Sequence, residues 1–142
     1  MSANDSTGAP FRGVIPAIVT PFRENGDVCA TKLADLVHRM LRAGCSGTVW
    51  PGSLGEGQTL SLEERIEGWR TIAAASTGAG NAFATISAAS TRDAVKQVEA
   101  AAKIGMNGCM ILPPYVHKGP WHEYRAHFEA MRSEEHTSEL QS

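Results

Sequence analysis

The fold is decided by the stretch Gly47-Thr48-Val49-Trp50-Pro51-Gly52-Ser53-Leu54-Gly55-Glu56-Gly57. It begins as a β-branched segment typical of a strand and ends in a turn of glycines, one hydroxyl and one carboxylate. A helix is predicted to start soon after it, because Ser61 can cap the first turn and Glu64 can return a hydrogen bond to the Ser61 amide. A strand, a polar turn and a helix in this order present backbone N–H groups to an anion. The stretch therefore predicts a parallel α/β fold whose chemistry lies where the strands end.

The rest of the chain alternates strand and helix patterns. Apolar residues at helical spacing, such as Leu33, Val37 and Met40, mark the helices, and short apolar runs mark the strands. Strands that alternate with helices predict βαβ units and a parallel sheet. We expect strands over residues 13–22, 48–50, 81–87 and 109–112, and helices over residues 33–41, 62–76 and 91–104. A fourth helix is expected to begin near Pro120, to turn Trp121, Tyr124 and Phe128 toward the core, and to lose its helical pattern after Met131.

A faint internal repeat bears on the architecture. Residues 44–47 (GCSG) and 105–108 (GMNG) each lie between a helix and a strand that ends in proline, two βα units apart. A repeat of this length is typical of a (β/α) barrel, in which each unit is built alike. The pattern alone also allows a four-stranded doubly wound sheet.

The composition is that of one ordinary domain. The chain has 142 residues, of which 42% are hydrophobic and 20% are charged. No apolar run approaches the roughly 18 residues of a membrane span, and no basic excess indicates nucleic acid. Cys29, Cys45 and Cys109 are far apart and are expected to be structural thiols in a reducing cytoplasm. We expect no metal, because His122 and His127 do not share a helix face. We expect no cofactor either, because Gly78 and Gly80 precede a strand and so do not form a dinucleotide fingerprint.

The two ends differ from the rest of the chain. Residues 1–10 are small and polar, lack the apolar core of a signal peptide, and are expected to be disordered. Residues 132–142 carry the whole net charge of −2, with one arginine against Glu134, Glu135 and Glu139. This segment resembles the conceptual translation of a sequencing-library adapter. We therefore expect residues 11–131 to form the folded part and residues 132–142 to be a non-native tail, with the natural reading frame continuing past residue 131.

Three ordered motifs resemble one enzyme family. They are GVIPAIVTPF followed by an Asn-Gly-Asp turn, AGCSGTVWPGSLGE with TLSLEER, and AAKIGMNGCMILPPY. They resemble the dihydrodipicolinate synthase / N-acetylneuraminate lyase family, and the resemblance extends over about residues 11–128. The resemblance implies a (β/α)8 TIM barrel in which a lysine on the sixth strand forms a Schiff base with pyruvate or another 2-oxo acid. It also implies a proton-shuttling tyrosine after the fifth strand, helped by a hydroxyl of the glycine-containing turn.

The resemblance assigns roles to the residues of that turn. Ser53 takes the catalytic hydroxyl position, and the backbone amides of Ser53 and Leu54, preceded by Gly52, bind the carboxylate of the 2-oxo acid. The chemistry is sensible, because aimed N–H groups hold a carboxylate without a mobile charge while the carbonyl becomes an iminium. Tyr115 is a further substrate-binding candidate, with packing or a subunit contact as the alternative. Glu56 is expected to be a buried brace of the turn.

Two positions depart from the family pattern. Leu54 occupies a position that is often threonine in the family, and Val116 stands where the synthases carry the second residue of a tyrosine pair. Both departures favour a sugar-acid aldolase or dehydratase over a true dihydrodipicolinate synthase.

The lysines indicate what the chain lacks. Lys32, Lys96 and Lys103 lie on expected helices and Lys118 follows the fourth strand, so none occupies a strand. The chain is therefore expected to be the N-terminal half, about four βα units, of a (β/α)8 barrel and to be inactive by itself. At full length we expect a cytoplasmic homo-oligomer, a dimer or tetramer, that acts on a small 2-oxo acid. The alternative is a complete, small flavodoxin-like α/β domain that binds a phosphate ligand.

Overall fold

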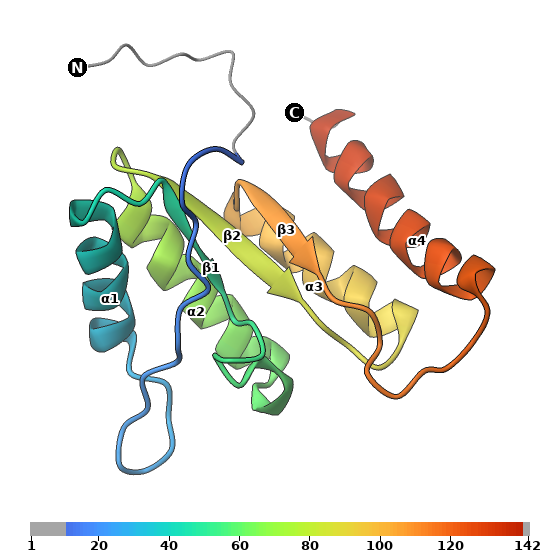
Figure 1. The fold of residues 1–142 in the computed structure, drawn as a ribbon, viewed down its shortest axis with the longest axis horizontal. Coiled ribbons are helices and arrows are strands. Elements are labelled where there is room, and N and C mark those ends of the chain that lie inside the picture. The colour runs from blue at the N-terminus through green and yellow to red at the C-terminus, as the bar shows by residue number, and fades with distance from the viewer. Residues whose placement is uncertain (1–10, 141–142) are drawn as a thin grey trace.

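A computed structural model describes the backbone of residues 11–140 and the side chains of residues 11–132 (Figure 1). Residues 1–10, for which we expected disorder, lie outside the described residues. The sheet has the parallel order β1-β2-β3, and its strands are β1 Gly47–Trp50, β2 Asn81–Ile86 and β3 Gly108–Ile111. The helices are α1 Ala30–Arg42, α2 Leu62–Ser76, α3 Thr91–Ile104 and α4 Trp121–Leu140, with a short 3-10 helix, η1, over Gly57–Thr59.

The N-terminal segment lies beside β1 without forming a regular strand. Ala17 bridges Val49 in parallel, because the Ile18 amide donates to the Val49 carbonyl (3.2 Å). The Val49 amide in turn donates to the Pro16 carbonyl (3.0 Å). Pro16 has no N–H and interrupts the ladder, so the strand expected over residues 13–22 is reduced to isolated bridges. The segment still occupies the expected position, at the outer edge of β1.

The helix ends follow the signals in the sequence. The Ser61 hydroxyl accepts from the Glu64 amide (3.1 Å) and the Glu64 carboxylate accepts from the Ser61 amide (3.3 Å), which confirms the capping box of α2. Ser90 caps α3 by accepting from the Asp93 amide (3.1 Å). At the other end of α3, Gly105 has a left-handed φ of 88°, a conformation that favours glycine.

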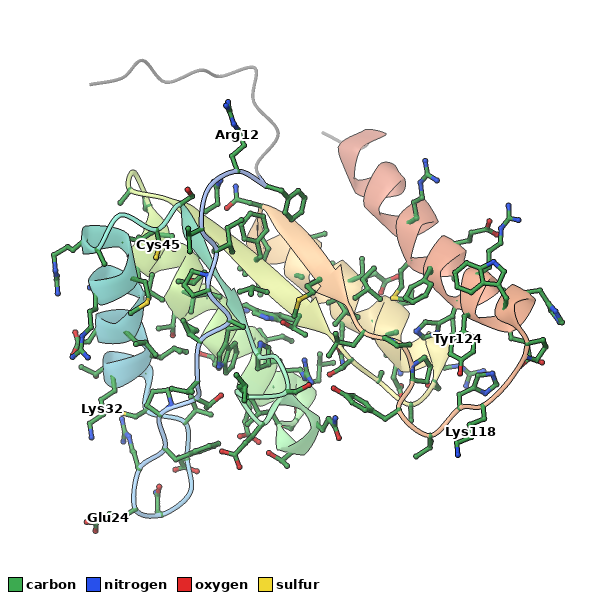
Figure 2. The ribbon with its side chains drawn as sticks, in the orientation of Figure 1. Arg12, Glu24, Lys32, Cys45, Lys118 and Tyr124 are labelled. Atoms are coloured by element: carbon green, nitrogen blue, oxygen red, sulfur yellow. The ribbon has the colours of Figure 1, made fainter. Side chains whose placement is uncertain are left out.

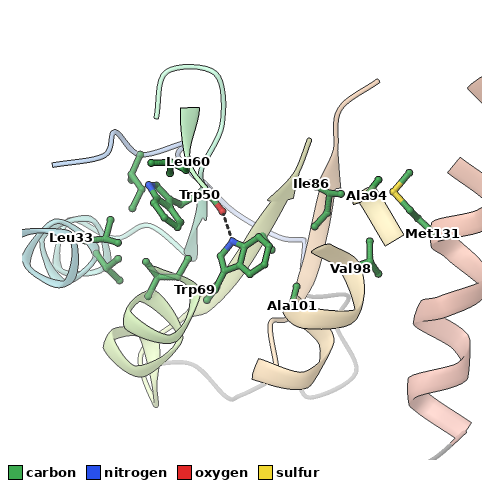
Figure 3. Close-up of a cluster of buried hydrophobic side chains, with 14 residues drawn as sticks. Leu33, Trp50, Leu60, Trp69, Ile86, Ala94, Val98, Ala101 and Met131 are labelled. Atoms are coloured by element: carbon green, nitrogen blue, oxygen red, sulfur yellow. Dashed lines mark hydrogen bonds between the residues drawn. The ribbon is translucent and has the colours of Figure 1, made fainter. Parts of the chain in front are cut away.

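The core lies between the sheet and the helices (Figure 3). Trp50 at the end of β1 is fully buried, and its indole N–H donates to the Thr20 hydroxyl (2.8 Å). The Trp69 indole N–H of α2 donates to the Trp50 carbonyl (3.0 Å), so Trp50 joins the N-terminal segment, β1 and α2. Gly68 allows this packing, because a Cβ there would lie 2.2 Å from ring carbons of Trp50. Other buried members of the cluster are Leu33, Val37, Ile72, Ala84, Ile86, Ala94, Val98, Ala101 and Met131.

The described helices lie on one side of the sheet (Figures 1 and 3). The core cluster takes Ala82, Ala84 and Ile86 from β2, and Phe83 between them faces the opposite side. On that side Phe11 stacks on Phe83, with ring centroids 4.8 Å apart. A doubly wound sheet carries helices on both faces, so the flavodoxin-like alternative is wrong. Sequential parallel strands with helices on one side are the arrangement of (β/α) barrel units.

The helix α4 differs from its expected form in two ways. Its buried face is formed by His127, Phe128 and Met131, whereas Trp121, which we expected to face the core, is 71% exposed. The ten residues between Trp121 and Met131 turn the helix through about 1,000°, so Trp121 points roughly 80° away from the face that carries Met131. The backbone also stays helical to Leu140, beyond the point where the apolar pattern ends.

Replacing Gly68 with alanine is expected to destabilise the chain by about 1–3 kcal/mol, because the new methyl group overpacks against the Trp50 ring. On an open helix surface the same change would instead stabilise by about 1 kcal/mol. Urea unfolding measures the difference. Ala74→Gly, on the exposed side of α2, is the control for helix propensity alone. A Gly68→Ala chain as stable as the original would contradict this packing.

The contact between α3 and α4 contains a buried histidine. His127 of α4 lies with its Nδ1 2.8 Å from the Thr91 hydroxyl of α3, and its Nε2 has no partner among the described residues. Burial lowers the pKa of His127, and the charge of His117 lowers it further. His117 itself pairs with Glu123 of α4, with Nε2 and Oε2 2.7 Å apart. A proton on His127 is therefore unfavourable in the folded chain.

We expect acid to weaken the folded state through this histidine. In the unfolded chain a histidine has a pKa of about 6.5, so the unfolded state binds more protons than the folded state. The stabilisation is present above about pH 6.5 and is lost as the pH falls through the lower folded-state pKa of His127. Unfolding free energies between about pH 7.5 and about pH 5 measure it. His127→Gln should flatten this dependence and His38→Gln, on the exposed side of α1, should not; equal slopes in the two variants would refute the explanation.

Candidate functional site

In the turn after β1, two backbone carbonyls accept hydrogen bonds from amides of the same turn, and two backbone amides point outward. The Gly52 carbonyl accepts from the amides of Gly55 and Gly57, both at 3.1 Å. The Ser53 carbonyl accepts from the amide three residues further on, also at 3.1 Å. In a trans peptide the N–H points away from the carbonyl of the same peptide unit. The amides of Ser53 and Leu54 therefore point out of the turn, and neither donates to an acceptor within the described residues.

A second loop brings Tyr115 to this turn. The Tyr115 hydroxyl lies 2.7 Å from Ser53 Oγ, and either oxygen can be the donor. Ser53 follows β1 and Tyr115 follows β3, so the contact joins the carboxyl ends of two strands that are not neighbours. Leu54 beside them is 76% exposed. The residues predicted for the site, Gly52, Ser53, Leu54 and Tyr115, thus lie together, and their roles remain predictions.

A buried arginine, which the sequence analysis missed, fastens the turn from the core side. Arg65 of α2 is 2% exposed and donates from Nη2 to the Gly57 carbonyl and to Ser87 Oγ (2.7 Å). Its Nη1 donates to the Thr85 carbonyl at the end of β2 (3.0 Å). Burial lowers the pKa of Arg65 to about 10, and the neighbouring Tyr115 opposes this shift more weakly. The guanidinium therefore remains charged at neutral pH.

The carboxylate of Glu56 does not brace the turn. Its side chain is exposed, and its φ of 55° lies in the left-handed region, which is uncommon for a residue with a Cβ. Its carbonyl accepts from the amide (3.0 Å) and hydroxyl (2.8 Å) of Thr59. The expectation of a buried glutamate was wrong, because Arg65 makes the buried bonds instead. The available signal was spacing: Arg65, Trp69 and Ile72 recur on one face of α2, and the other two are apolar.

The steric need for glycine differs between two positions of the turn, Gly52 and Gly57. A Cβ at Gly57 would lie 2.4 Å from the Pro51 carbonyl oxygen, so the turn closes only without a side chain there. A Cβ at Gly52 would meet nothing nearer than the Met110 methyl, at 3.8 Å. Gly52 is itself buried, but a Cβ there would make only an ordinary van der Waals contact, so its surroundings do not require glycine.

A cavity of about 260 Å³ adjoins the Tyr115 side chain. The backbone of Ser87 at its wall is held twice by Gln97 of α3, whose Oε1 accepts from the Ser87 amide (3.0 Å) and whose Nε2 donates to the Ser87 carbonyl (2.9 Å). The Ser87 oxygen accepts from Arg65, which leaves the Ser87 hydroxyl proton to donate elsewhere. The lining residues are Gln58, Ser87, Ala88, Ala89, Tyr115 and Val116.

The fold has counterparts among known proteins. The model of the dihydrodipicolinate synthetase family matches residues 10–139. The chain belongs to this family. An uncharacterized DapA-like lyase of Rhizobium meliloti is 39% identical over 104 residues, which are 73% of this chain and 35% of the relative. The 4-hydroxy-tetrahydrodipicolinate synthase of Synechocystis sp. is 36% identical over 126 residues, 87% of this chain and 41% of the relative.

Solved structures of the dihydrodipicolinate synthetase family agree with this assignment. The dihydrodipicolinate synthase from Cyanidioschyzon merolae with lysine bound matches with a TM-score of 0.85 at 29% identity, over 89% of this chain and 43% of that one. The chain thus spans about two fifths of the length of the relatives it matches. It corresponds to the N-terminal half of the family's (β/α)8 barrel, as predicted.

No lysine lies on a described strand. Lys32 is on α1, Lys96 and Lys103 are on α3, and Lys118 lies in the loop before α4 (Figure 2). The Schiff-base lysine that the family resemblance assigns to the sixth strand therefore has no counterpart among the described units.

Other kinds of site find no support in the described part of the chain. Its His, Cys, Asp and Glu side chains form no group of three that could hold a metal ion. The cysteines Cys29, Cys45 and Cys109 are all free thiols. Within residues 11–140, no helix combines the length and apolar character needed to cross a membrane.

Proposed function

We propose that this chain supplies the carboxylate-binding turn and part of the hydroxyl relay of a Schiff-base-forming lyase that acts on pyruvate or another 2-oxo acid. The observation that carries the proposal is the pair of outward amides at Ser53 and Leu54 beside the hydroxyl pair of Ser53 and Tyr115. Membership of a lyase family supports the same reading.

The arrangement fits the needs of a 2-oxo acid. Its carboxylate must be held while the adjacent carbonyl becomes an iminium, and two fixed N–H donors satisfy one carboxylate without a mobile charge. The Ser53 hydroxyl, already hydrogen-bonded to Tyr115, can pass a proton between substrate and tyrosine. In this proposal the full-length enzyme supplies the lysine of the sixth strand and the tyrosine of the fifth.

Two residues near the turn bear on which reaction the lyase carries out. Leu54 gives the site an exposed apolar side chain where the family often has threonine, and Val116 removes a second tyrosine hydroxyl from the loop after β3. Both changes favour a sugar-acid aldolase or dehydratase over a synthase. We further propose that the whole enzyme is a cytoplasmic homo-oligomer, in keeping with the resemblance.

Pyruvate is expected to bind the purified chain at roughly millimolar concentration and to shift the amide resonances of Ser53 and Leu54. The measurement is a titration of the ¹⁵N-labelled chain. The Gly55 and Gly57 amides are the internal control, because they are engaged inside the turn and should shift less. Ser53→Ala keeps the amide and should bind pyruvate within about threefold of the original, since it loses only the hydroxyl contact. Shifts confined to other regions would contradict the proposed cradle.

The chain by itself is expected to form no imine with pyruvate, because it has no strand lysine near the turn. Borohydride reduction in the presence of pyruvate, followed by peptide mass spectrometry, tests this. The full-length 4-hydroxy-tetrahydrodipicolinate synthase of Synechocystis sp. serves as the comparison for a complete barrel. A pyruvate adduct on one specific lysine of this chain, such as Lys118, would show the expectation to be wrong.

A further inference from the structure

Arg65 is a buried cation without a counter-ion. All three of its acceptors are neutral oxygens, namely the carbonyls of Gly57 and Thr85 and the hydroxyl of Ser87. Among the described residues no carboxylate pairs with it. Removing a guanidinium from water is costly, and a buried arginine therefore usually has an acidic partner. The positive charge of Arg65 is therefore not neutralised by any described side chain.

The guanidinium lies directly behind the carboxylate-binding turn. It donates to the Gly57 carbonyl, and the Gly57 amide donates to the Gly52 carbonyl, whose peptide unit carries the outward Ser53 amide. On the other side it interacts electrostatically with Tyr115, which bonds Ser53. Arg65 thus sits behind both sets of groups that face the site.

We propose that Arg65 is a positioning residue of the 2-oxo-acid site, which holds the turn of residues 52–57 against the end of β2 and whose unpaired charge draws the ligand carboxylate to the outward amides. The inference rests on the proposed function, because the carboxylate of a 2-oxo acid is the anion that the charge would serve. The arginine is not a catalytic residue, since the turn separates it from the ligand.

An arginine suits this task better than a lysine. Its planar fork reaches acceptors on three segments at once, namely the turn, the end of β2 and the residue after β2. Its charge persists at neutral pH despite burial, whereas a buried lysine loses its proton more readily. Arg70, five residues further along α2, makes a useful contrast, because its side chain is 62% exposed and pairs with Glu67.

The test compares pyruvate binding by the full 142-residue chain and its variants, with the dissociation constant read from the Ser53 and Leu54 amide shifts. Arg65→Met is expected to weaken pyruvate binding by roughly tenfold or more, and the control Arg70→Met should leave it unchanged. Pyruvamide, a neutral analogue with the same carbonyl, separates charge from shape. Arg65→Met should weaken pyruvamide binding less than pyruvate binding, because pyruvamide loses only the hold on the turn and has no charge for Arg65 to attract. Equal weakening of the two ligands would overturn the role of the charge.

The outcomes distinguish this inference from the proposed function. If the wild-type chain shows no pyruvate-dependent shifts at the turn, the proposed function fails and the inference falls with it. If the wild type binds pyruvate and folded Arg65→Met binds it equally well, only the role of Arg65 is overturned. If Arg65→Met does not fold, Arg65→Lys decides: it should keep pyruvate affinity within about threefold while the Gly57 amide exchanges faster with solvent. Loss of pyruvate binding in a folded Arg65→Lys chain that does not recover as the pH is lowered, where a buried lysine regains its proton, would refute the role of the charge.

Discussion

The Gly52 carbonyl accepts two hydrogen bonds from within its own turn, and the direction of the site depends on this constraint. With that carbonyl held inside, the Ser53 amide in the same peptide plane has only one direction left, outward. No side chain has to become ordered to create this donor. A group that is already aimed needs no reorganisation when charge arrives, which is why fixed backbone donors stabilise anions effectively in enzyme sites.

The turn could not keep this geometry without fixed ends. Trp50 anchors its start, because the indole is buried against α2 and bonds Thr20 of the N-terminal segment. The Thr20 hydroxyl in turn donates to the Gly55 carbonyl in the middle of the turn. Arg65 holds the far end through Gly57. The side chains that anchor the turn also belong to the buried packing of β1 and α2, so a defect in this packing would reach the site.

Sequence reasoning succeeded where the signal is local and failed where it depends on tertiary contacts. The capping box at Ser61 and the alternation of strands and helices depend on residues close together in the sequence, and both predictions were confirmed. The strand expected over residues 13–22 failed because one proline outweighs an apolar run at a sheet edge. Glu56 was misjudged and Arg65 was missed, because the acceptors that a buried polar side chain needs come together only in the folded chain. The bond between Ser53 and Tyr115 spans 62 positions of sequence, beyond the reach of any periodicity.

Under the proposed function, the chemistry of a 2-oxo acid explains why groups must contact the ligand from two directions. Its carboxylate and its carbonyl are adjacent carbons, yet one must be held by donors while the other is attacked by an amine, and a single loop cannot approach both from suitable directions. Parallel strands of a barrel bring all their carboxyl ends to one mouth. Under the proposed function, the turn after β1 and the loop after β3 form the wall that binds the carboxylate and supplies a hydroxyl. The amine then has to come from strands across the mouth. One half of the barrel would thus bind the carboxylate, and the other half would form the imine.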